Sequence, residues 1–167
     1  MITENLINQE ALKKMKDLIE NIKIAFLLTN LNKHPINAVP MTTKKVDDNG
    51  NILFLSRLNS EHNINIANSP EVQLLYGHPS DLDFISIYGH ASIIYDKKII
   101  KELYTSEDDA WINDENDPNL TVLKIIPQEA YFWDSKENTF NKLFKRGMAA
   151  VKGEKPDTTD KKGKINL

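Results

Sequence analysis

The sequence contains no cysteine among its 167 residues. Disulfide bonds, thiol catalysis and zinc sites built from cysteine are therefore excluded for this chain. The absence of cysteine is compatible with a reducing compartment. Together with the missing signal and membrane segments described next, it leads us to expect a cytoplasmic protein. The four histidines are widely separated and form no pair at the spacing of metal ligands, and we expect no metal site.

Long hydrophobic runs are also missing. No apolar segment approaches the roughly 20 residues that a helix needs to cross a bilayer. The N-terminus lacks the basic and apolar regions of a secretory signal. The formal net charge is −3, with lysine and arginine spread along the chain. We therefore expect a protein that associates with neither membranes nor nucleic acid.

Three widespread catalytic or nucleotide-binding patterns are absent. The sequence has no GxSxG elbow, no phosphate-binding GxxxxGK(S/T) loop and no GxGxxG fingerprint. The acidic run at 106–119 lacks the glycine and the glutamate that complete an EF-hand loop, so we interpret it as a solvated connector. Trp111 lies within this run, and two interpretations stay open for it: packing in the core, or contact with something specific.

The apolar residues that are present fall into short strand-like runs and a few helical patterns. Helices are predicted at 8–22, 60–68, 97–104 and 140–151, and strands at 24–30, 36–46, 52–56, 72–76, 83–95, 120–127 and 129–135. Most strand pairs are joined by turns rather than by crossover helices, which indicates an antiparallel sheet.

Three small residues predict local features of that sheet. Asn49-Gly50 tolerates the positive φ of a tight hairpin turn. Pro40 predicts an edge strand or a bulge, and Gly89 predicts a bulge or bend. The expected fold class is mainly β: a compact antiparallel β-barrel with flanking helices. We predict one domain over 1–151, followed by a polar and mobile tail over 152–167.

The stretch NILFLSRLNSEHN, residues 51–63, combines the end of a strand with the start of a helix. Ser60 can cap that helix, whose free N–H groups and dipole favour an anion. Ser56, Arg57 and His62 would add hydroxyl and cationic donors. Two interpretations stay open from the residues alone: a polar loop with a helix cap, or a cradle for an anionic ligand.

An ordered series of short motifs extends through most of the chain. In order, the motifs are PMTT, DDNGN, LFLS, NSEH, IANSPEVQLLY, ISIYGHA, DPNLTVLKIIP and AYFWDS. From about Ile19 to Val151 the chain thereby resembles the general stress protein branch of the pyridoxamine 5′-phosphate oxidase-like, flavin-binding split-barrel proteins. The resemblance implies a split antiparallel β-barrel that forms a homodimer, with FMN held at the subunit interface.

The resemblance also implies which residues contact FMN. Ser56 and Ser60 stand at usual phosphate-binding positions, and Lys44 matches a flavin-contacting lysine of the oxidases. Backbone groups of four residues would line the ring and ribityl chain. The complete predicted set is Met41, Thr42, Lys44, Phe54, Leu55, Ser56, Arg57, Ser60, His62 and Trp111, the four backbone contributors being Met41, Thr42, Phe54 and Leu55.

Three positions depart from the family pattern. Val39 stands where an arginine is usual, Glu61 where the oxidases often have arginine, and His62 where lysine is usual. These departures remove permanent positive charge from the expected phosphate site. We expect Arg57, Lys44 and the helix end to compensate if FMN binds tightly.

The resemblance supports three hypotheses about function. The first is a homodimeric FMN-binding protein with an oxidoreductase-like redox role in stress. The second is a non-catalytic protein that binds or sequesters flavin. The third is a barrel that has lost FMN and binds another planar ligand or a protein partner. Oxidation of pyridoxamine phosphate itself is not expected, because the basic residues that position that substrate are not evident. No catalytic residue is assigned.

Overall fold

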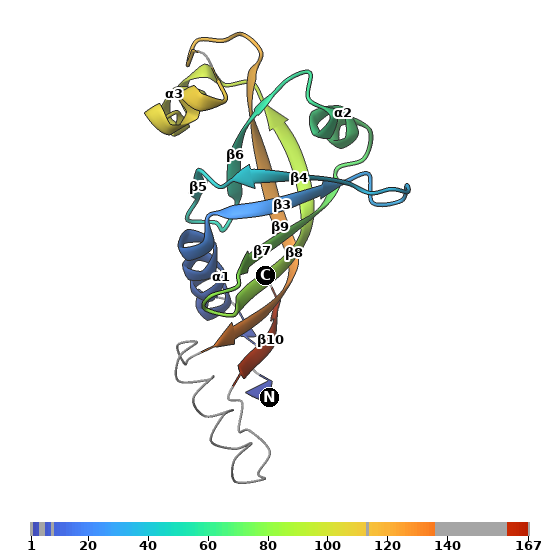
Figure 1. Ribbon diagram of the computed structural model, residues 1–167, viewed down its shortest axis with the longest axis vertical. Coiled ribbons are helices and arrows are strands. Elements are labelled where there is room, and N and C mark those ends of the chain that lie inside the picture. The colour runs from blue at the N-terminus through green and yellow to red at the C-terminus, as the bar shows by residue number, and fades with distance from the viewer. Residues whose placement is uncertain (1, 4–5, 8, 113, 136–159, 167) are drawn as a thin grey trace.

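The computed structural model describes residues 2–3, 6–7, 9–112, 114–135 and 160–166 (Figure 1). The strands are β1 (Ile2–Thr3), β2 (Leu6–Ile7), β3 (Ile24–Thr29), β4 (Asn37–Thr42), β5 (Lys45–Val46), β6 (Ile52–Arg57), β7 (Glu71–His78), β8 (Asp83–Ile94), β9 (Leu120–Ser135) and β10 (Asp160–Asn166). The helices are α1 (Gln9–Ile22), α2 (Glu61–Asn68) and α3 (Lys97–Leu103), with the 3-10 turn η1 (Ser106–Ala110).

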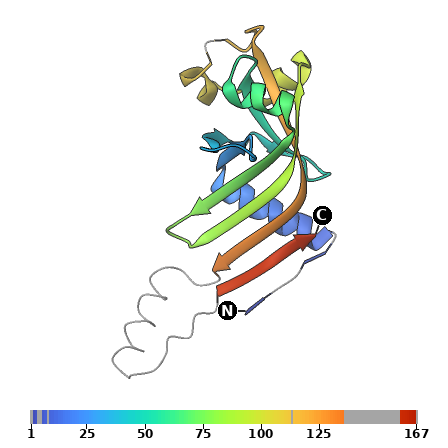
Figure 2. The same ribbon diagram turned by 90° about the vertical axis from the view of Figure 1, so that its right-hand side faces the viewer.

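The antiparallel strands curl into a half-barrel in the order β4-β3-β7-β8-β9-β6-β5 (Figures 1 and 2). β4 is the edge of this order, which agrees with the edge position predicted from Pro40. Strand β9 joins the two parts of the sheet, since its first half pairs with β6 and its second half with β10.

β9 is continuous, whereas two strands were predicted, at 120–127 and 129–135. That prediction was wrong, because the strand continues through Pro127. Pro127 instead lies opposite Gly89, where the register between β8 and β9 shifts. A proline has no N–H to donate, and a bulge is a place where the ladder already lacks a bond. The bulge predicted at Gly89 is confirmed, and a Cβ there would lie 2.6 Å from the Ile126 carbonyl oxygen.

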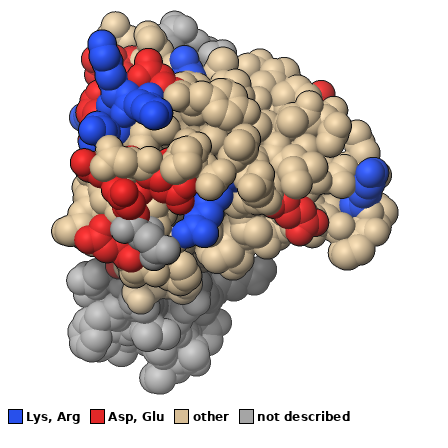
Figure 3. Space-filling model, turned by 90° about the horizontal axis from the view of Figure 1, so that it is seen from above, with Lys and Arg blue, Asp and Glu red and all other residues tan. Residues whose placement is uncertain are grey.

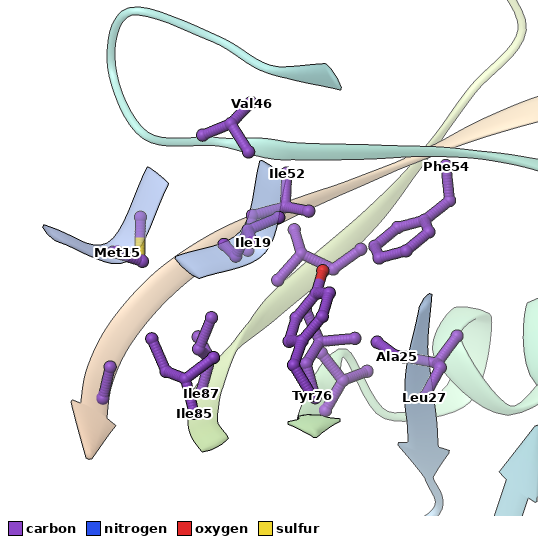
Figure 4. Packing of buried hydrophobic residues seen from close by; sticks show 14 of the residues in the cluster. Met15, Ile19, Ala25, Leu27, Val46, Ile52, Phe54, Tyr76, Ile85 and Ile87 are labelled. Carbon is purple, nitrogen blue, oxygen red and sulfur yellow. The ribbon is translucent and has the colours of Figure 1, made fainter. Parts of the chain in front are cut away.

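The main core lies between the concave face of the sheet and α1 (Figure 4). Met15 and Ile19 of α1 are fully buried against residues of β6, β7 and β8. The cluster includes Ile52, Phe54, Tyr76, Ile85 and Ile87, which Figure 4 labels. The alternating burial of β3 places one face of that strand in this core and leaves the other face exposed.

A second, smaller cluster holds α3 and the segment after it against β6 and β9. Ile100, Leu103 and Ile112 are buried there against strand residues that include Leu53 and Val122. This cluster fixes the position of η1 relative to the end of β6. It therefore places the acidic connector of the sequence beside a strand end, while most of the connector's described residues stay exposed to solvent, as predicted.

The turn between β5 and β6 confirms the hairpin predicted from Asn49-Gly50. Gly50 has φ +81°, and the Asp47 carboxylate accepts hydrogen bonds from the backbone N–H groups of Asn49 and Asn51.

Two predictions concern the C-terminal part of the chain. The helix predicted at 140–151 lies outside the described residues. Within the predicted polar tail, 152–167, residues Asp160–Asn166 form strand β10, which pairs with β9, β1 and β2. The polar composition of that strand concealed it from the sequence pattern. Among the described residues, no helix has the length and apolar character needed to cross a membrane.

Candidate functional site

A cavity of about 460 Å³ lies where β4, the end of β6, the start of α2 and the segment after η1 meet. Its lining residues are Ile24, Pro40, Met41, Thr42, Lys44, Leu55, Ser56, Arg57, Ser60, His62, Asp108, Trp111 and Ile112. All of the residues predicted to bind the cofactor are in this lining except Phe54. The side chain of Phe54 is fully buried in the main core, and its predicted contribution was through the backbone.

The start of α2 forms one wall of the cavity. Ser60 is the helix cap predicted from the sequence, and its hydroxyl accepts a 3.3 Å hydrogen bond from the Asn63 backbone N–H. The first N–H groups of a helix have no acceptor within the helix. The N–H groups of Glu61 and His62 are therefore available, together with the positive end of the helix dipole.

Ser56 is the centre of a buried hydrogen-bond network. Its hydroxyl donates to Asn63 Oδ1 at 2.7 Å, and the Asn63 amide donates to the Thr121 hydroxyl at 3.0 Å. His62 Nε2 lies 2.7 Å from the same Ser56 oxygen. Because the single Ser56 proton is directed to Asn63, His62 must donate to it through Nε2–H. Ser56 thus orients His62.

His62 is a neutral imidazole at neutral pH in this environment. Burial lowers its pKa below the usual value, and the charge of the neighbouring Glu61 opposes this only in part. The imidazole therefore offers a hydrogen-bonding group rather than a permanent charge. An anion bound beside it would favour protonation and raise its pKa.

The two cations of the cavity both contact the segment that follows α3. The Arg57 guanidinium donates a 2.6 Å hydrogen bond to the Trp111 carbonyl oxygen. The Lys44 ammonium lies 2.7 Å from Asp108 Oδ2 and donates to the Thr105 hydroxyl at 3.1 Å. Arg57 is exposed and keeps further N–H donors, whereas the charge of Lys44 is already compensated.

The ionised state of Asp108 follows from these contacts. Burial alone would raise its pKa, but hydrogen bonds from Lys44 and from Thr105, with the charge of Lys44, bring the pKa below its usual range. Figure 3 shows the molecule from above, where acidic and basic side chains lie close together on one side of the visible face. The other part of the face is largely uncharged.

Apolar side chains form the opposite wall. Met41 is half-buried against the core, and Leu55 is half-buried on β6. Trp111 is 81% exposed beside the cavity, so the interpretation that it packs in the core is wrong. The donors at the start of α2 and this apolar wall together fit a molecule with an anionic end and an apolar body.

Sequence reasoning missed two residues that matter for the cavity. Asp108 was assigned to a solvated connector, although Thr105 and Asp108 have capping-box spacing, which directs a side chain back toward the helix start. For Asn63 the sequence predicted only a place within the helix at 60–68. Its contacts with Ser56 and Thr121 join strands distant in sequence, and no local pattern encodes them.

The three departures from the family pattern have distinct places. Val39 packs against the main core from β4, so its position is apolar rather than cationic. Glu61 is exposed as the first residue of α2, and His62 contacts Ser56. The cavity therefore lacks permanent positive charge at these three positions.

Comparison with known proteins points to the family that the motifs of this chain indicated. The family model described as "Pyridoxamine 5'-phosphate oxidase like" matches residues 10–157. General stress protein 26 of Bacillus subtilis (strain 168) is 26% identical over 77 residues, which are 44% of this chain. The match spans about half of that relative's length, 55%.

Solved structures support the fold. A general stress protein 26 from Jannaschia sp. CCS1 has a TM-score of 0.75 at 18% identity, with 95% of this chain and 98% of that chain covered. The general stress FMN/FAD binding protein from Xanthomonas citri has a TM-score of 0.66 at 20% identity, with 78% and 93% covered. The predicted split-barrel fold class is thereby confirmed.

Proposed function

This chain belongs to the pyridoxamine 5′-phosphate oxidase like family, and on that basis we propose that it binds FMN in the cavity at the start of α2. The observation that carries the proposal is the grouping of nearly all predicted cofactor contacts around one cavity. The name of the Xanthomonas citri neighbour, a general stress FMN/FAD binding protein, points the same way.

The phosphate would lie at the N-terminus of α2. Its partners would be the Ser60 hydroxyl, the free N–H groups of Glu61 and His62, and the remaining N–H groups of Arg57. The His62 imidazole would join them by gaining a proton at Nδ1 when the phosphate binds, because its Nε2–H already donates to Ser56. A helix N-terminus binds phosphate through such N–H groups and its dipole. Ser56 would act by orienting His62 rather than by donating to the phosphate, since its proton is directed to Asn63.

The flavin ring would lie along Met41, Leu55 and Trp111. Lys44 has three N–H protons, of which two are used by Asp108 and Thr105, so one is left for a ring carbonyl oxygen. When bound, FMN supplies the electron-transfer chemistry, and this chain's residues bind it, orient it and exclude water. A redox role in stress physiology and a cytoplasmic location, in keeping with the lack of cysteine, are parts of the same proposal.

A titration with two flavins tests the binding site. The purified protein should bind FMN with the visible absorbance of a flavin. FMN should also bind more tightly than riboflavin, by about 100-fold or more, because the phosphate would accept at least two charge-assisted hydrogen bonds that contribute roughly 1.5–3 kcal/mol each. Calorimetry and the visible spectrum measure both affinities. Absence of FMN binding would refute the proposed function, and equal affinities would place the phosphate outside the α2 site.

A separate measurement distinguishes redox activity from storage. Anaerobic addition of NADH or NADPH to the FMN-loaded protein should bleach the flavin absorbance within seconds to minutes if the protein has a redox role. A spectrum that stays oxidised would favour the second function, a flavin-binding or sequestering protein. That alternative is supported by the fact that Lys44 and Ser56 already have protein partners.

The proposal includes a homodimer that completes the cavity. Phe26 pairs in register with Pro40 on one side and with Leu75 on the other. Phe26 is 53% exposed and Leu75 is 40% exposed, so an apolar stripe faces outward across β4, β3 and β7. Pro40 also lines the cavity, together with the exposed Ile24. A second copy seated on this stripe would cover both the apolar surface and the open side of the cavity.

Introducing a charge on the stripe should therefore separate the dimer. Phe26→Asp should weaken self-association by about 100-fold or more, because a carboxylate would be buried without a partner. Analytical ultracentrifugation measures this change, and FMN affinity should fall in parallel. Tyr95→Asp is the matched control, since Tyr95 is 61% exposed and lies next to α3. An unchanged sedimentation profile for Phe26→Asp would refute this interface.

A further inference from the structure

A second cavity adjoins the proposed flavin cavity. It measures about 650 Å³ and is bounded by α1, by the chain around β5 and by α3 with the residues after it. Thr42 and Lys44 line both cavities. Lys44 is therefore the charged side chain at the junction between them. A molecule in the second cavity would meet the flavin cavity at this lysine.

The remaining charges of the second cavity largely compensate one another. Lys23 and Glu107 contribute one charge of each sign to its lining. Lys45 pairs with Glu102 at 2.7 Å, and Lys16 lies 3.9 Å from Glu20 along α1. These pairs are exposed, with 48% and 62% of the side chain accessible in the Lys45–Glu102 pair. Such exposed pairs are screened by solvent and select weakly for the charge of a ligand. The Lys44–Asp108 pair at the junction is much less exposed than these pairs.

Lys44 and Asp108 have side chains that are only 9% and 14% exposed. Charges interact more strongly where water is excluded, so the charge state of this pair controls the potential at the junction. Asp108 is held by Thr105 as well as by Lys44. Its carboxylate also accepts hydrogen bonds from the Thr105 backbone N–H, at 2.8 Å, and from the Thr105 hydroxyl, at 3.1 Å.

We propose that Asp108 is a specificity-determining residue: by compensating Lys44 it makes the junction select a reaction partner without negative charge. The second cavity is then the place where an uncharged molecule approaches the flavin. This inference rests on the proposed function, because a molecule in the second cavity can be a reaction partner only if a flavin is bound in the first. Asp108 acts through Lys44 and needs no contact with the reacting atoms.

Replacing Asp108 with its uncharged isostere tests the inference. The Asp108→Asn protein, saturated with FMN, should bind inorganic pyrophosphate about tenfold or more tightly than the unmodified protein does. Isothermal titration calorimetry measures both affinities without any turnover. Adding Lys44→Met to Asp108→Asn should abolish the gain, because the ammonium that attracts the anion is then absent.

Glu102→Gln is the matched control. It removes the acid of the exposed pair with the same 2.7 Å separation, and pyrophosphate affinity should stay within about twofold. Equal pyrophosphate affinities for the unmodified and Asp108→Asn proteins would overturn the inference, as would an equal gain in Glu102→Gln. Thermal unfolding and far-UV circular dichroism establish that each variant is folded.

The outcome is separable from that of the flavin proposal. If FMN does not bind, the same pyrophosphate titrations are made on the flavin-free protein. The difference in pyrophosphate affinity between Asp108→Asn and the double variant that also carries Lys44→Met then measures the contribution of Lys44. If Asp108→Asn binds pyrophosphate more tightly in the flavin-free protein, Asp108 still sets the charge preference, although the flavin proposal is refuted. No gain there overturns the assignment of Asp108 as well.

Discussion

Replacing Ser60 and His62 together with alanine should weaken FMN binding by about 100-fold to 10,000-fold. Each side chain would contribute one charge-assisted hydrogen bond to the phosphate, worth roughly 1.5–3 kcal/mol, and two such bonds correspond to about 3–6 kcal/mol. Calorimetric titration with FMN measures the loss. Riboflavin affinity should change little, because riboflavin carries no phosphate.

The control for this double variant addresses the helix cap. Ser60→Ala also removes a cap hydrogen bond to Asn63, which costs about 1 kcal/mol of stability. Asp96→Ala removes the equivalent cap of α3, where the carboxylate accepts from the N–H groups of Lys98 and Ile99. Asp96→Ala should lose similar stability and keep its FMN affinity. An unchanged FMN affinity in the double variant would refute the proposed position of the phosphate at α2.

Truncating Phe54 to alanine should lower the free energy of unfolding by about 3–5 kcal/mol. The ring is fully buried between the sheet and the other residues of the main core (Figure 4), so its removal leaves a cavity there. Urea denaturation measures the change. FMN affinity at low temperature should be reduced far less than in the Ser60 and His62 double variant, since the Phe54 side chain does not line the flavin cavity.

Phe84→Ala provides the comparison of the same residue type. Phe84 is 36% exposed and lies beside the turn between β7 and β8, so its truncation should cost less than half as much as that of Phe54. A loss below about 1 kcal/mol in Phe54→Ala would contradict the tight packing of the ring described for the core.

Features decided by a few neighbouring residues could be predicted from the sequence. The Ser60 cap, the Asn49-Gly50 turn and the Gly89 bulge each depend on local backbone preferences, and the structure has all three. The grouping of Ser56, Ser60 and His62 was also predictable, because a strand end followed directly by a helix start keeps these residues together.

Features decided by distant residues could not be predicted in the same way. Lys44 and Asp108 are 64 positions apart, and neither the lysine nor the acidic run indicates the other. The second hydrophobic cluster brings them together by holding α3 against β6 and β9. Pro127 is a comparable case, since its place in a continuous strand depends on the bulge opposite Gly89 in another strand.

The continuous strand β9 has a consequence for how the molecule opens. Over much of its length β9 is hydrogen-bonded on both edges, to β8 on one side and to β6 and then β10 on the other. Amide protons in such a strand exchange with solvent only through large-scale opening. The segment around η1 is held instead by one small cluster and a few side-chain bonds. Local opening should therefore start at η1, and it would open an entrance to the proposed flavin cavity while the barrel stays folded.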